Sequence, residues 1–284
     1  MNNEITPEKD PNGQLLKTAI EAALKAGKEI LAIYEDPKAD FQVERKADNS
    51  PLTVADRRSN DIITHLLGST PYPILSEEGR DIAYDERRTW RTLWIVDPLD
   101  GTKEFIKRNG EFTVNIALVT DGVPVAGVIY VPVRHELYFA DMAHGAYKMP
   151  GIASLEGLHD LDTLRSRALR LPYSELHPHY VVVASSSHAT PETTAFIDDL
   201  RRDHKDLELV SIGSSLKLCL VAEGKADIYP RFAPTMEWDT AAGHAIVRAA
   251  GGEVYHTGEQ ADIPLRYNKE NLLNPWFIVR RIHN

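Results

Sequence analysis

Hydrophobic residues recur every three or four positions over residues 15–34, which is the spacing of one buried face of a helix. Pro37 follows just beyond the point where that helix is expected to end. A second helix is expected to begin after Thr53, its N-cap, and to end near Gly68. Its first turn carries Asp56, so this helix presents an acid at its N-terminus.

Two short apolar runs are expected to form buried strands, and both end in acids. The run "YPILSEEG" ends in Glu77 and Glu78, and "TLWIVDP" leads into Asp97 and Asp100. Over residues 112–139, β-rich runs alternate with turn sequences, which predicts an antiparallel meander of three strands.

From about residue 150 to 179 the pattern loosens into loop-like sequence, and beyond it strand and helix patterns alternate. Thr190 and Pro191 supply the cap and first position of one of these helices. We expect an N-terminal α+β part over residues 1–179 that carries most candidate metal ligands, and a C-terminal α/β part over residues 180–284 that completes the same functional unit. The expected C-terminal elements are strands in "YVVVASSSH", "LELVSIG", "ADIYPR" and "WFIVRR" and helices in "TPETTAFIDDLRRD", "SLKLCLVAEG" and "WDTAAGHAIVRAAGG".

Composition narrows the class of protein. The chain has 284 residues, 43% of them hydrophobic, enough for one large core or two smaller ones. Its 32 basic and 42 acidic residues give a formal net charge of −10, which disfavours a polymeric nucleic acid as partner. The single cysteine, Cys219, excludes an internal disulfide framework and suits the cytosol. The polar start of the chain and the lack of a long apolar stretch disfavour secretion and a transmembrane segment.

Carboxylates at strand ends are the main chemical signal. Mg²⁺ prefers oxygen ligands in near-octahedral geometry and is held by a few carboxylates, waters and substrate phosphate oxygens. In "DPLDG", Pro98 stiffens a sharp turn, so the two aspartates can converge while the carbonyl of Leu99 faces the same way. Gly101 leaves room for a phosphate against the backbone. The candidate carboxylate ligands are Glu77, Asp97, Asp100 and Asp239.

The same residues also have purely structural explanations. A D-P-x-D-G segment is commonly a surface turn. Asp239, at the start of the helix in "EWDTAAGHA", could serve only as an N-cap or first-turn acid, worth about 1 kcal/mol. Three features favour a site: the run before the acids is too apolar for a surface strand, another acidic pair ends the preceding strand, and a further acid starts a strongly apolar helix.

The segments "SEEG", "WIVDPLDGTKEF" and "WDTAAGHAIVRAAGG" together resemble the motifs of the inositol monophosphatase superfamily of Mg²⁺-dependent, lithium-sensitive phosphatases. The resemblance spans roughly residues 15–280, with the motifs in the family's order. It implies a layered α-β-α-β-α sandwich whose active site lies between the two parts. It also implies two or three Mg²⁺ ions held by Glu77, Asp97, Asp100, Asp239 and the carbonyl of Leu99.

The resemblance further implies catalytic roles. Asp56 and Thr102 would orient the attacking water and help to deprotonate it, next to the ligand Glu77. Lys46 would lie near the more loosely held metal, and Glu78 would be a supporting acid. The substrate contacts implied on the same motifs are Leu99, Asp100, Gly101, Thr102 and Asp239.

A finer resemblance concerns the subfamily. The tail Lys103, Glu104 and Phe105 after D-G-T, with "GSSLKLCLVAEGKADIYPR", looks like the CysQ-type 3′(2′),5′-bisphosphate nucleotidases. This implies hydrolysis of adenosine 3′,5′-bisphosphate to AMP and phosphate by direct attack of water, which would keep sulfate assimilation from stalling on its by-product. The sulfated analogue, 3′-phosphoadenosine 5′-phosphosulfate, is a second candidate substrate. The alternatives are an inositol-1-phosphate or sugar phosphatase with the same metal site, and a non-catalytic sensor of metal or nucleotide.

A substrate with two phosphates needs cationic donors away from the metals. Lys217 offers a point charge and Arg231 a bidentate fork, and both fall at nucleotide-contact positions by resemblance. Ser214, one turn before Lys217 on the expected helix, could donate a hydrogen bond beside it. The alternatives are a solvated helix lysine, a serine N-cap, and a strand-end arginine paired with an acid.

Other reactive residues carry weaker signals. His188 is either a nucleotide contact or a loop residue, and His177 and His179 lack the partners of a zinc site. Cys219 is expected to pack in the core and not to act as a nucleophile. The sequence leaves open whether the protein is a monomer or a homodimer, and whether it contacts the cytoplasmic face of the inner membrane peripherally.

Overall fold

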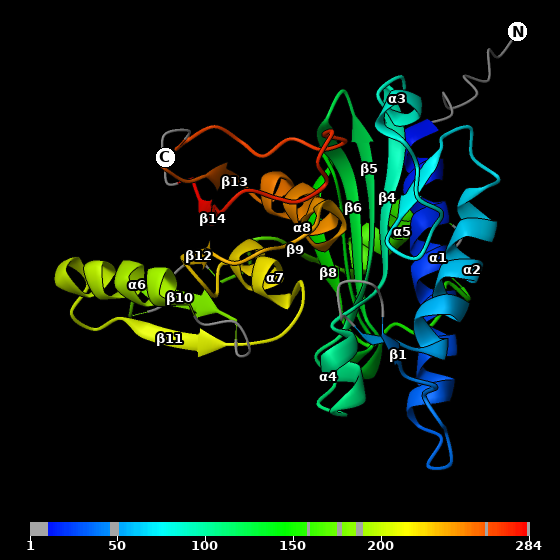
Figure 1. The fold of residues 1–284 in the computed structure, drawn as a ribbon, viewed down its shortest axis with the longest axis horizontal. Coiled ribbons are helices and arrows are strands. Elements are labelled where there is room, and N and C mark those ends of the chain that lie inside the picture. The colour runs from blue at the N-terminus through cyan, green and yellow to red at the C-terminus, as the bar shows by residue number, and fades with distance from the viewer. Residues whose placement is uncertain are drawn as a thin grey trace, which may run out of the picture.

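In the described residues, the computed structural model shows two large β-sheets and a small two-stranded one, with helices packed on and between the large sheets (Figure 1). Lys46, His177 and His188 lie outside the described residues. The structure describes residues 11–45, 51–157, 160–174, 178–185, 190–258 and 261–282.

The larger sheet has seven strands in the order β3-β4-β5-β6-β7-β8-β9. Its β3 and β4 are parallel, and every other neighbouring pair is antiparallel, so the expected meander is confirmed as β5, β6 and β7. The strands are β3 (Ile74–Ser76), β4 (Thr92–Asp100), β5 (Thr113–Thr120), β6 (Val123–Val131), β7 (Glu136–Asp141), β8 (Gly145–Met149) and β9 (Leu169–Arg170). A separate small ribbon pairs β1 (Glu44–Arg45) with β2 (Pro51–Leu52).

The smaller sheet has five strands in the order β11-β10-β12-β14-β13. β10 pairs in parallel with β11 and β12, whereas β14 is antiparallel to both of its neighbours. The strands are β10 (Val181–Ala184), β11 (Glu208–Ser211), β12 (Ile228–Arg231), β13 (Gly252–His256) and β14 (Phe277–Arg281).

Helices complete the layered α-β-α-β-α sandwich, which confirms the expected fold (Figure 1). On the outer face of the larger sheet lie α1 (Pro11–Tyr34) and α2 (Val54–Leu67). Between the sheets lie α7 (Leu216–Glu223) and α8 (Glu237–Ala249), and α6 (Pro191–Asp203) covers the other face of the smaller sheet. Short helical segments are α3 (Tyr84–Arg87), α4 (Thr102–Ile106), η1 (Pro132–Arg134) and α5 (Leu161–Arg167).

The sequence pattern indicated that residues 150–179 form a loop, and this expectation is wrong in part. They contain α5 and β9, and Asp160 caps α5 by accepting a hydrogen bond from the Thr163 amide at 2.7 Å. Leu161 and Leu164 of this helix are buried in the core on the outer face of the larger sheet. A helix of seven residues has only two turns, too few for periodicity to stand out.

The two sheets divide along the chain. Every strand of the larger sheet precedes residue 171, and every strand of the smaller sheet follows residue 180. We therefore propose the boundary between residues 1–179 and 180–284 as a division into two parts. Because α8 contacts β4, β5 and β6 as well as β13, the second part also covers the inner face of the first.

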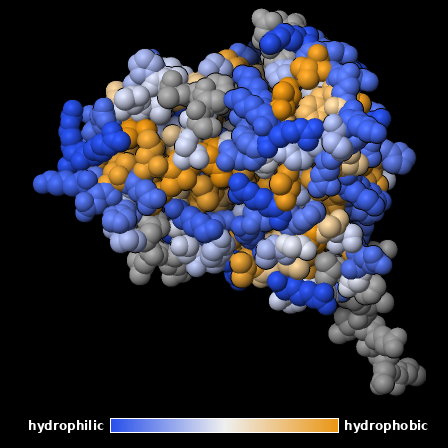
Figure 2. Space-filling view, turned by 90° about the horizontal axis from the view of Figure 1, so that it is seen from below, coloured by the Kyte–Doolittle hydropathy of each residue, from blue (hydrophilic) through white to orange (hydrophobic). Residues whose placement is uncertain are grey.

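Hydrophobic residues gather at the surface of the C-terminal half, at the left of the molecule in Figure 2. An apolar groove lies in this half beside α6, with Phe196, Phe232 and Trp276 in its wall. The ring centroid of Phe232 lies 5.3 Å from that of Phe196 and 5.6 Å from that of Trp276. As for membranes, none of the described helices combines the length and hydrophobicity that a membrane span requires.

Candidate active site

Asp97 to Asp100 of the motif "DPLDG" lie in β4 and not in a turn after it, so the sharp turn expected at Pro98 is wrong, and only Gly101 lies beyond the strand. β4 runs to Asp100, and its pairing with β5 shifts register between the pairs Asp97–Asn115 and Asp100–Thr113. Pro98 and Leu99 thus form a bulge, a device that re-aims strand side chains. The hydroxyl of Ser59 donates to the Pro98 carbonyl at 2.6 Å and anchors this bulge to α2.

Three aspartates converge at the bulge. Asp97 and Asp100 flank it, and Asp239 comes from the first turn of α8, so carboxylate oxygens of all three lie within 4.8 Å of one another. Glu77 follows β3, where its amide donates to the Val96 carbonyl at 3.1 Å, and it lines the same cavity. The acids that the sequence suggested as ligands are therefore brought together in space.

The chemistry of this cluster fits a bound cation. Burial, followed by repulsion from Glu77 and the other two aspartates, raises the pKa of Asp97 well above its usual range. Burial and the Asp100 charge raise the pKa of Asp239 to about 8. The Oδ2 atom of Asp97 is buried without a hydrogen-bond partner among the described residues. A divalent cation would supply the missing partner and stabilise the ionised carboxylates, and the Leu99 carbonyl lies in the same bulge.

Asp56 and Thr102 are in direct contact. The Thr102 hydroxyl donates to Asp56 Oδ1 at 3.0 Å and lies 3.3 Å from the Leu99 carbonyl oxygen. Asp56 Oδ2 accepts from the Thr53 amide at 2.8 Å, which confirms Thr53 as the N-cap of α2. Burial raises the pKa of Asp56, and its hydrogen bonds from Thr53 and Thr102 oppose that rise. The helix cap therefore fixes the carboxylate that holds Thr102.

The sequence did not single out two residues that position Asp100. The Ser215 hydroxyl lies 2.8 Å from Asp100 Oδ2 and 3.0 Å from the Asp239 carbonyl oxygen. Asn115 of β5 donates to the Ser215 hydroxyl at 2.9 Å, and its own amide oxygen accepts from Thr113 at 2.9 Å. An asparagine in the middle of the apolar run "FTVNIALV" was the available signal, because a buried polar side chain requires partners.

Ser214 lies before α7 and not on it, at φ 49°, so its expected place on the helix is wrong. Its hydroxyl lies 3.0 Å from the carbonyl oxygen of Asp100 and 2.6 Å from that of Glu111. The N-cap position belongs to Ser215, so the alternative role of Ser214 as an N-cap is also wrong. Gly101 has φ +90°, and a Cβ there would lie only 2.1 Å from the Ser214 hydroxyl oxygen.

Lys217 and Arg231 are both buried in the cavity wall. Lys217 is 5% exposed, which excludes a solvated helix lysine, and its ammonium donates to the Ser214 carbonyl at 2.6 Å. Burial lowers the pKa of Lys217 to about 8. Arg231 donates to the Pro234 carbonyl at 3.1 Å while its Nε remains buried without a hydrogen bond in the described chain. No ion pair joins Arg231 to an acid of the described part, so the proposed strand-end pair is not formed.

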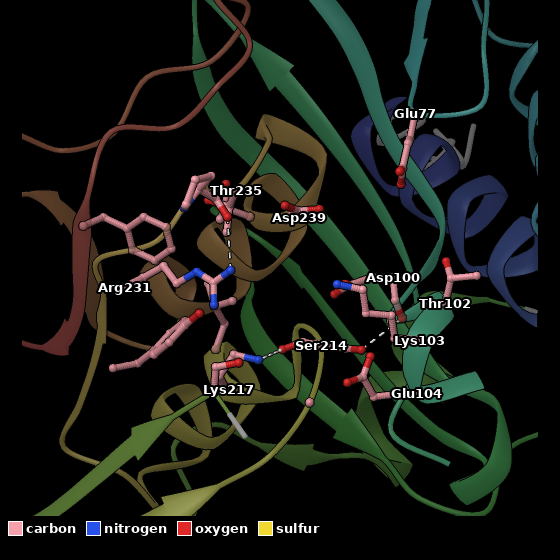
Figure 3. Close-up of a pocket in the computed structure, with 18 of the residues that line it drawn as sticks. Glu77, Asp100, Thr102, Lys103, Glu104, Ser214, Lys217, Arg231, Thr235 and Asp239 are labelled. Carbon is pink, nitrogen blue, oxygen red and sulfur yellow. Dashed lines mark hydrogen bonds between the residues drawn. The ribbon is translucent and has the colours of Figure 1, made fainter. Parts of the chain in front are cut away.

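These groups surround one cavity of about 260 Å³. Figure 3 shows Asp100, Thr102 and Glu77 on one side and Lys217 and Arg231 on the other. Cys219 points elsewhere, buried in the core between the sheets, as expected of a packing residue. The cavity thus has an acidic end and a basic end.

Comparisons with known proteins agree with this geometry. The sequence profile described as the inositol monophosphatase family matches residues 12–277, so the chain belongs to the inositol monophosphatase family. The family assignment rests on nearly the whole chain and includes all four acids at the acidic end of the cavity.

Among its relatives, the 3′(2′),5′-bisphosphate nucleotidase CysQ of Escherichia coli (strain K12) is 43% identical over 268 residues, covering 93% of this chain and 99% of that protein. The crystal structure of CysQ from Bacteroides thetaiotaomicron is 61% identical, with a TM-score of 0.89 over 96% of this chain and 98% of that one. The suppressor protein SuhB from Bartonella henselae is 27% identical, with a TM-score of 0.70 and 94% coverage of both chains.

Proposed function

We propose that this protein hydrolyses the 3′-phosphate of adenosine 3′,5′-bisphosphate to give AMP and phosphate, with Mg²⁺ as its cofactor. The sulfated analogue, 3′-phosphoadenosine 5′-phosphosulfate, is a second substrate of the same class. Support comes from the relatives named 3′(2′),5′-bisphosphate nucleotidase that share 43% of the aligned sequence over almost their full length.

The observation that carries the proposal is the pair of buried cations opposite the acid cluster. A monophosphate needs only the acidic end with its metal ions. Lys217 and Arg231 are 5% and 9% exposed, and both line the cavity. Burying unpaired cations is costly, so they are best explained by an anion that binds there. A substrate with a second phosphate provides that anion.

At the acidic end, two or three Mg²⁺ ions would be held by five groups: Glu77, Asp97, the Leu99 carbonyl, Asp100 and Asp239. These ligands are more than one hydrated Mg²⁺ requires. When bound, the ions neutralise charge on the phosphate and make water a stronger nucleophile. Li⁺ would inhibit by occupying one of the metal positions.

The attacking water is held and deprotonated by a pair of residues. The Thr102 hydroxyl donates a hydrogen bond to Asp56, so the lone pairs of the Thr102 oxygen can accept a hydrogen bond from water. Asp56 receives a proton through this hydroxyl as the water oxygen bonds to phosphorus. The bond from phosphorus to the 3′-oxygen breaks, that oxygen takes up a proton from solvent water, and Asp56 returns its proton to solvent. No phosphoryl group is transferred to the protein.

At the basic end, Lys217 and Arg231 would bind the second phosphate. Two of the three N–H groups of Lys217 are directed at the carbonyls of Ser214 and Ile212, at 2.6 Å and 3.3 Å, so the third remains for a ligand. Arg231 adds the planar fork that suits a phosphate. We place the protein in the cytoplasm as a monomer or homodimer that acts on a small nucleotide.

A substrate panel tests the proposal. Steady-state phosphate release is measured from adenosine 3′,5′-bisphosphate and from inositol 1-phosphate at equal concentration, with Mg²⁺ and with or without Li⁺. We expect a higher kcat/KM for the bisphosphate, dependence on Mg²⁺ and inhibition by Li⁺. A preference for inositol 1-phosphate would make the protein an inositol phosphatase, and absence of any release would support a sensor.

A further inference from the structure

Glu104, in the tail that follows the D-G-T motif, is a largely buried acid whose half-buried carboxylate group faces the cavity. The residue is 7% exposed and lines the cavity. Its own backbone N–H is the one hydrogen-bond donor to this carboxylate among the described residues. An acid in such a place normally pairs with a donor, so the carboxylate is available to a donor on the ligand.

The position of Glu104 lies between the two ends of the cavity. Its Oε2 is 3.4 Å from the place of a Cβ on Gly101, beside the acidic end. Its Cγ is 3.0 Å from the place of a Cβ on Gly213, in the loop that leads to Lys217. Its carboxylate interacts electrostatically with both Asp100 and Lys217. Figure 3 shows Glu104 next to Ser214, on the side of the cavity away from Arg231.

This position faces the sugar of the proposed substrate. In a nucleoside 3′,5′-bisphosphate the ribose connects the two phosphates, so it lies between the two ends of the cavity. Ionised phosphates have no strong donors, and the ribose has one, the hydroxyl next to the scissile phosphate. Resting on the proposed function, we propose that Glu104 accepts a hydrogen bond from this vicinal hydroxyl and selects ribonucleotides.

A comparison of two substrates tests the assignment. kcat/KM is measured for adenosine 3′,5′-bisphosphate and for its 2′-deoxy analogue, with the wild-type protein and with Glu104→Ala. The wild-type protein should prefer the ribonucleotide roughly 10- to 100-fold, the size expected for a hydrogen bond to a charged group. Glu104→Ala should reduce this preference to within about twofold, because only the ribonucleotide loses a contact.

A neighbouring carboxylate provides the control. Glu111 accepts a hydrogen bond from the Gly213 amide at 2.8 Å, so it supports the same loop without an assigned substrate contact. Glu111→Gln should change kcat/KM for both nucleotides by the same factor and preserve the preference. Wild-type protein that hydrolyses both nucleotides equally would overturn the assignment, even if Glu104→Ala did not fold.

The adenine amino group is the competing donor. Inosine 3′,5′-bisphosphate lacks it and is measured in parallel. If Glu104→Ala abolished a preference for adenosine over inosine but kept the preference for ribose, the carboxylate would contact the base and the proposal would be wrong. If the wild-type protein hydrolyses the bisphosphates and Glu104→Ala keeps the same preference for ribose, this inference alone is contradicted. If the wild-type protein hydrolyses neither bisphosphate, the proposed function is contradicted.

Discussion

At the scale of single residues, the two carboxylate oxygens of Asp97 have different surroundings. Oδ1 accepts a hydrogen bond from the Leu99 amide at 3.1 Å, which helps to shape the bulge. Oδ2 is buried and has no partner in the described chain. An asparagine could keep the first contact through its own oxygen but would lack the charge that a cation requires.

Asp97→Asn is therefore expected to reduce turnover of adenosine 3′,5′-bisphosphate by more than about 100-fold at limiting Mg²⁺. Mutation of a residue that only supports a metal ligand typically costs about 10- to 100-fold in metal affinity or activity, and loss of a ligand itself should cost more. The measurement is phosphate release as a function of Mg²⁺ concentration. Asp121→Asn is the matched control, because Asp121 is an exposed acid paired with Arg91. Wild-type rates for Asp97→Asn at limiting Mg²⁺ would disprove its role as a ligand.

Lys217 should determine how binding of the second phosphate depends on pH. Burial lowers its pKa to about 8, so the ammonium form is present below that pH and is lost as the pH rises through it. Since only the ammonium attracts phosphate strongly, kcat/KM for the bisphosphate should fall above about pH 8. This profile reports ionisation in the free enzyme.

Lys217→Met should raise KM for the bisphosphate, leave kcat nearly unchanged and remove this step from the pH profile. Adenosine 3′-monophosphate, which lacks the second phosphate, is the control substrate, and the substitution should change its kcat/KM little. An equal loss for both substrates would show that Lys217 supports the fold and does not bind the second phosphate.

At the scale of elements, Gly101 lets the end of β4 meet the loop before α7. Its φ of +90° is in the region that favours glycine, and its Cα faces the Ser214 hydroxyl. Gly101→Ala should lower the free energy of unfolding by about 2 kcal/mol or more, because it adds a clash to backbone strain of about 1 kcal/mol.

Chemical denaturation measures this difference. Gly151→Ala is the control, since Gly151 has φ +70° but, beyond its two chain neighbours, no heavy atom of the described chain lies within 4 Å of the place its Cβ would take, so it tests backbone strain alone. Equal destabilisation by both substitutions would mean that the contact between Gly101 and Ser214 does not hold the two elements together.

The elements with strong patterns could be predicted from the sequence. α1 and α2 follow a regular hydrophobic period, and Thr53 caps α2 as its position indicated. The four acids and the two buried cations are also found together in the cavity region. These features depend on short stretches of sequence or on recognisable motifs, so they can be predicted from the amino-acid sequence alone.

Other features depend on contacts between distant segments. The bulge at Pro98 requires a partner strand, and residue spacing alone suggested a turn. Asn115 and Ser215 are 100 positions apart, and only the fold brings them to Asp100. The environment of the Glu104 carboxylate likewise depends on what surrounds it, which no pattern along the chain reveals.

At the scale of the whole molecule, a buried charge network joins the two parts of the chain. Glu223, at the end of α7, is 1% exposed and accepts hydrogen bonds from Lys148 of β8 at 2.9 Å and from Tyr173 at 2.6 Å. Tyr138 and Lys225 also contact this carboxylate. Burial tends to raise the pKa of Glu223, but the hydrogen bonds outweigh it and hold the pKa below its usual value.

Glu223→Gln should lower the free energy of unfolding by about 1–3 kcal/mol, because it removes the charge that Lys148 and Lys225 share while Lys148 keeps its ion pair with Glu136 at 2.9 Å. Thermal and urea unfolding measure the effect. Glu44→Gln, which removes an exposed partner of Arg57, should leave the midpoints unchanged. A Glu223→Gln protein as stable as the Glu44→Gln protein would show that the network does not hold the two parts together.

In the proposed function, the two parts together direct water to the 3′-phosphorus of a bisphosphate. The most direct measurement is turnover of adenosine 3′,5′-bisphosphate with Mg²⁺ in ¹⁸O-labelled water, followed by ³¹P NMR and mass spectrometry of the products. We expect adenosine 5′-monophosphate without label and inorganic phosphate with one oxygen from water. Adenosine 3′-monophosphate as the product, or label in the nucleotide, would contradict the proposed reaction.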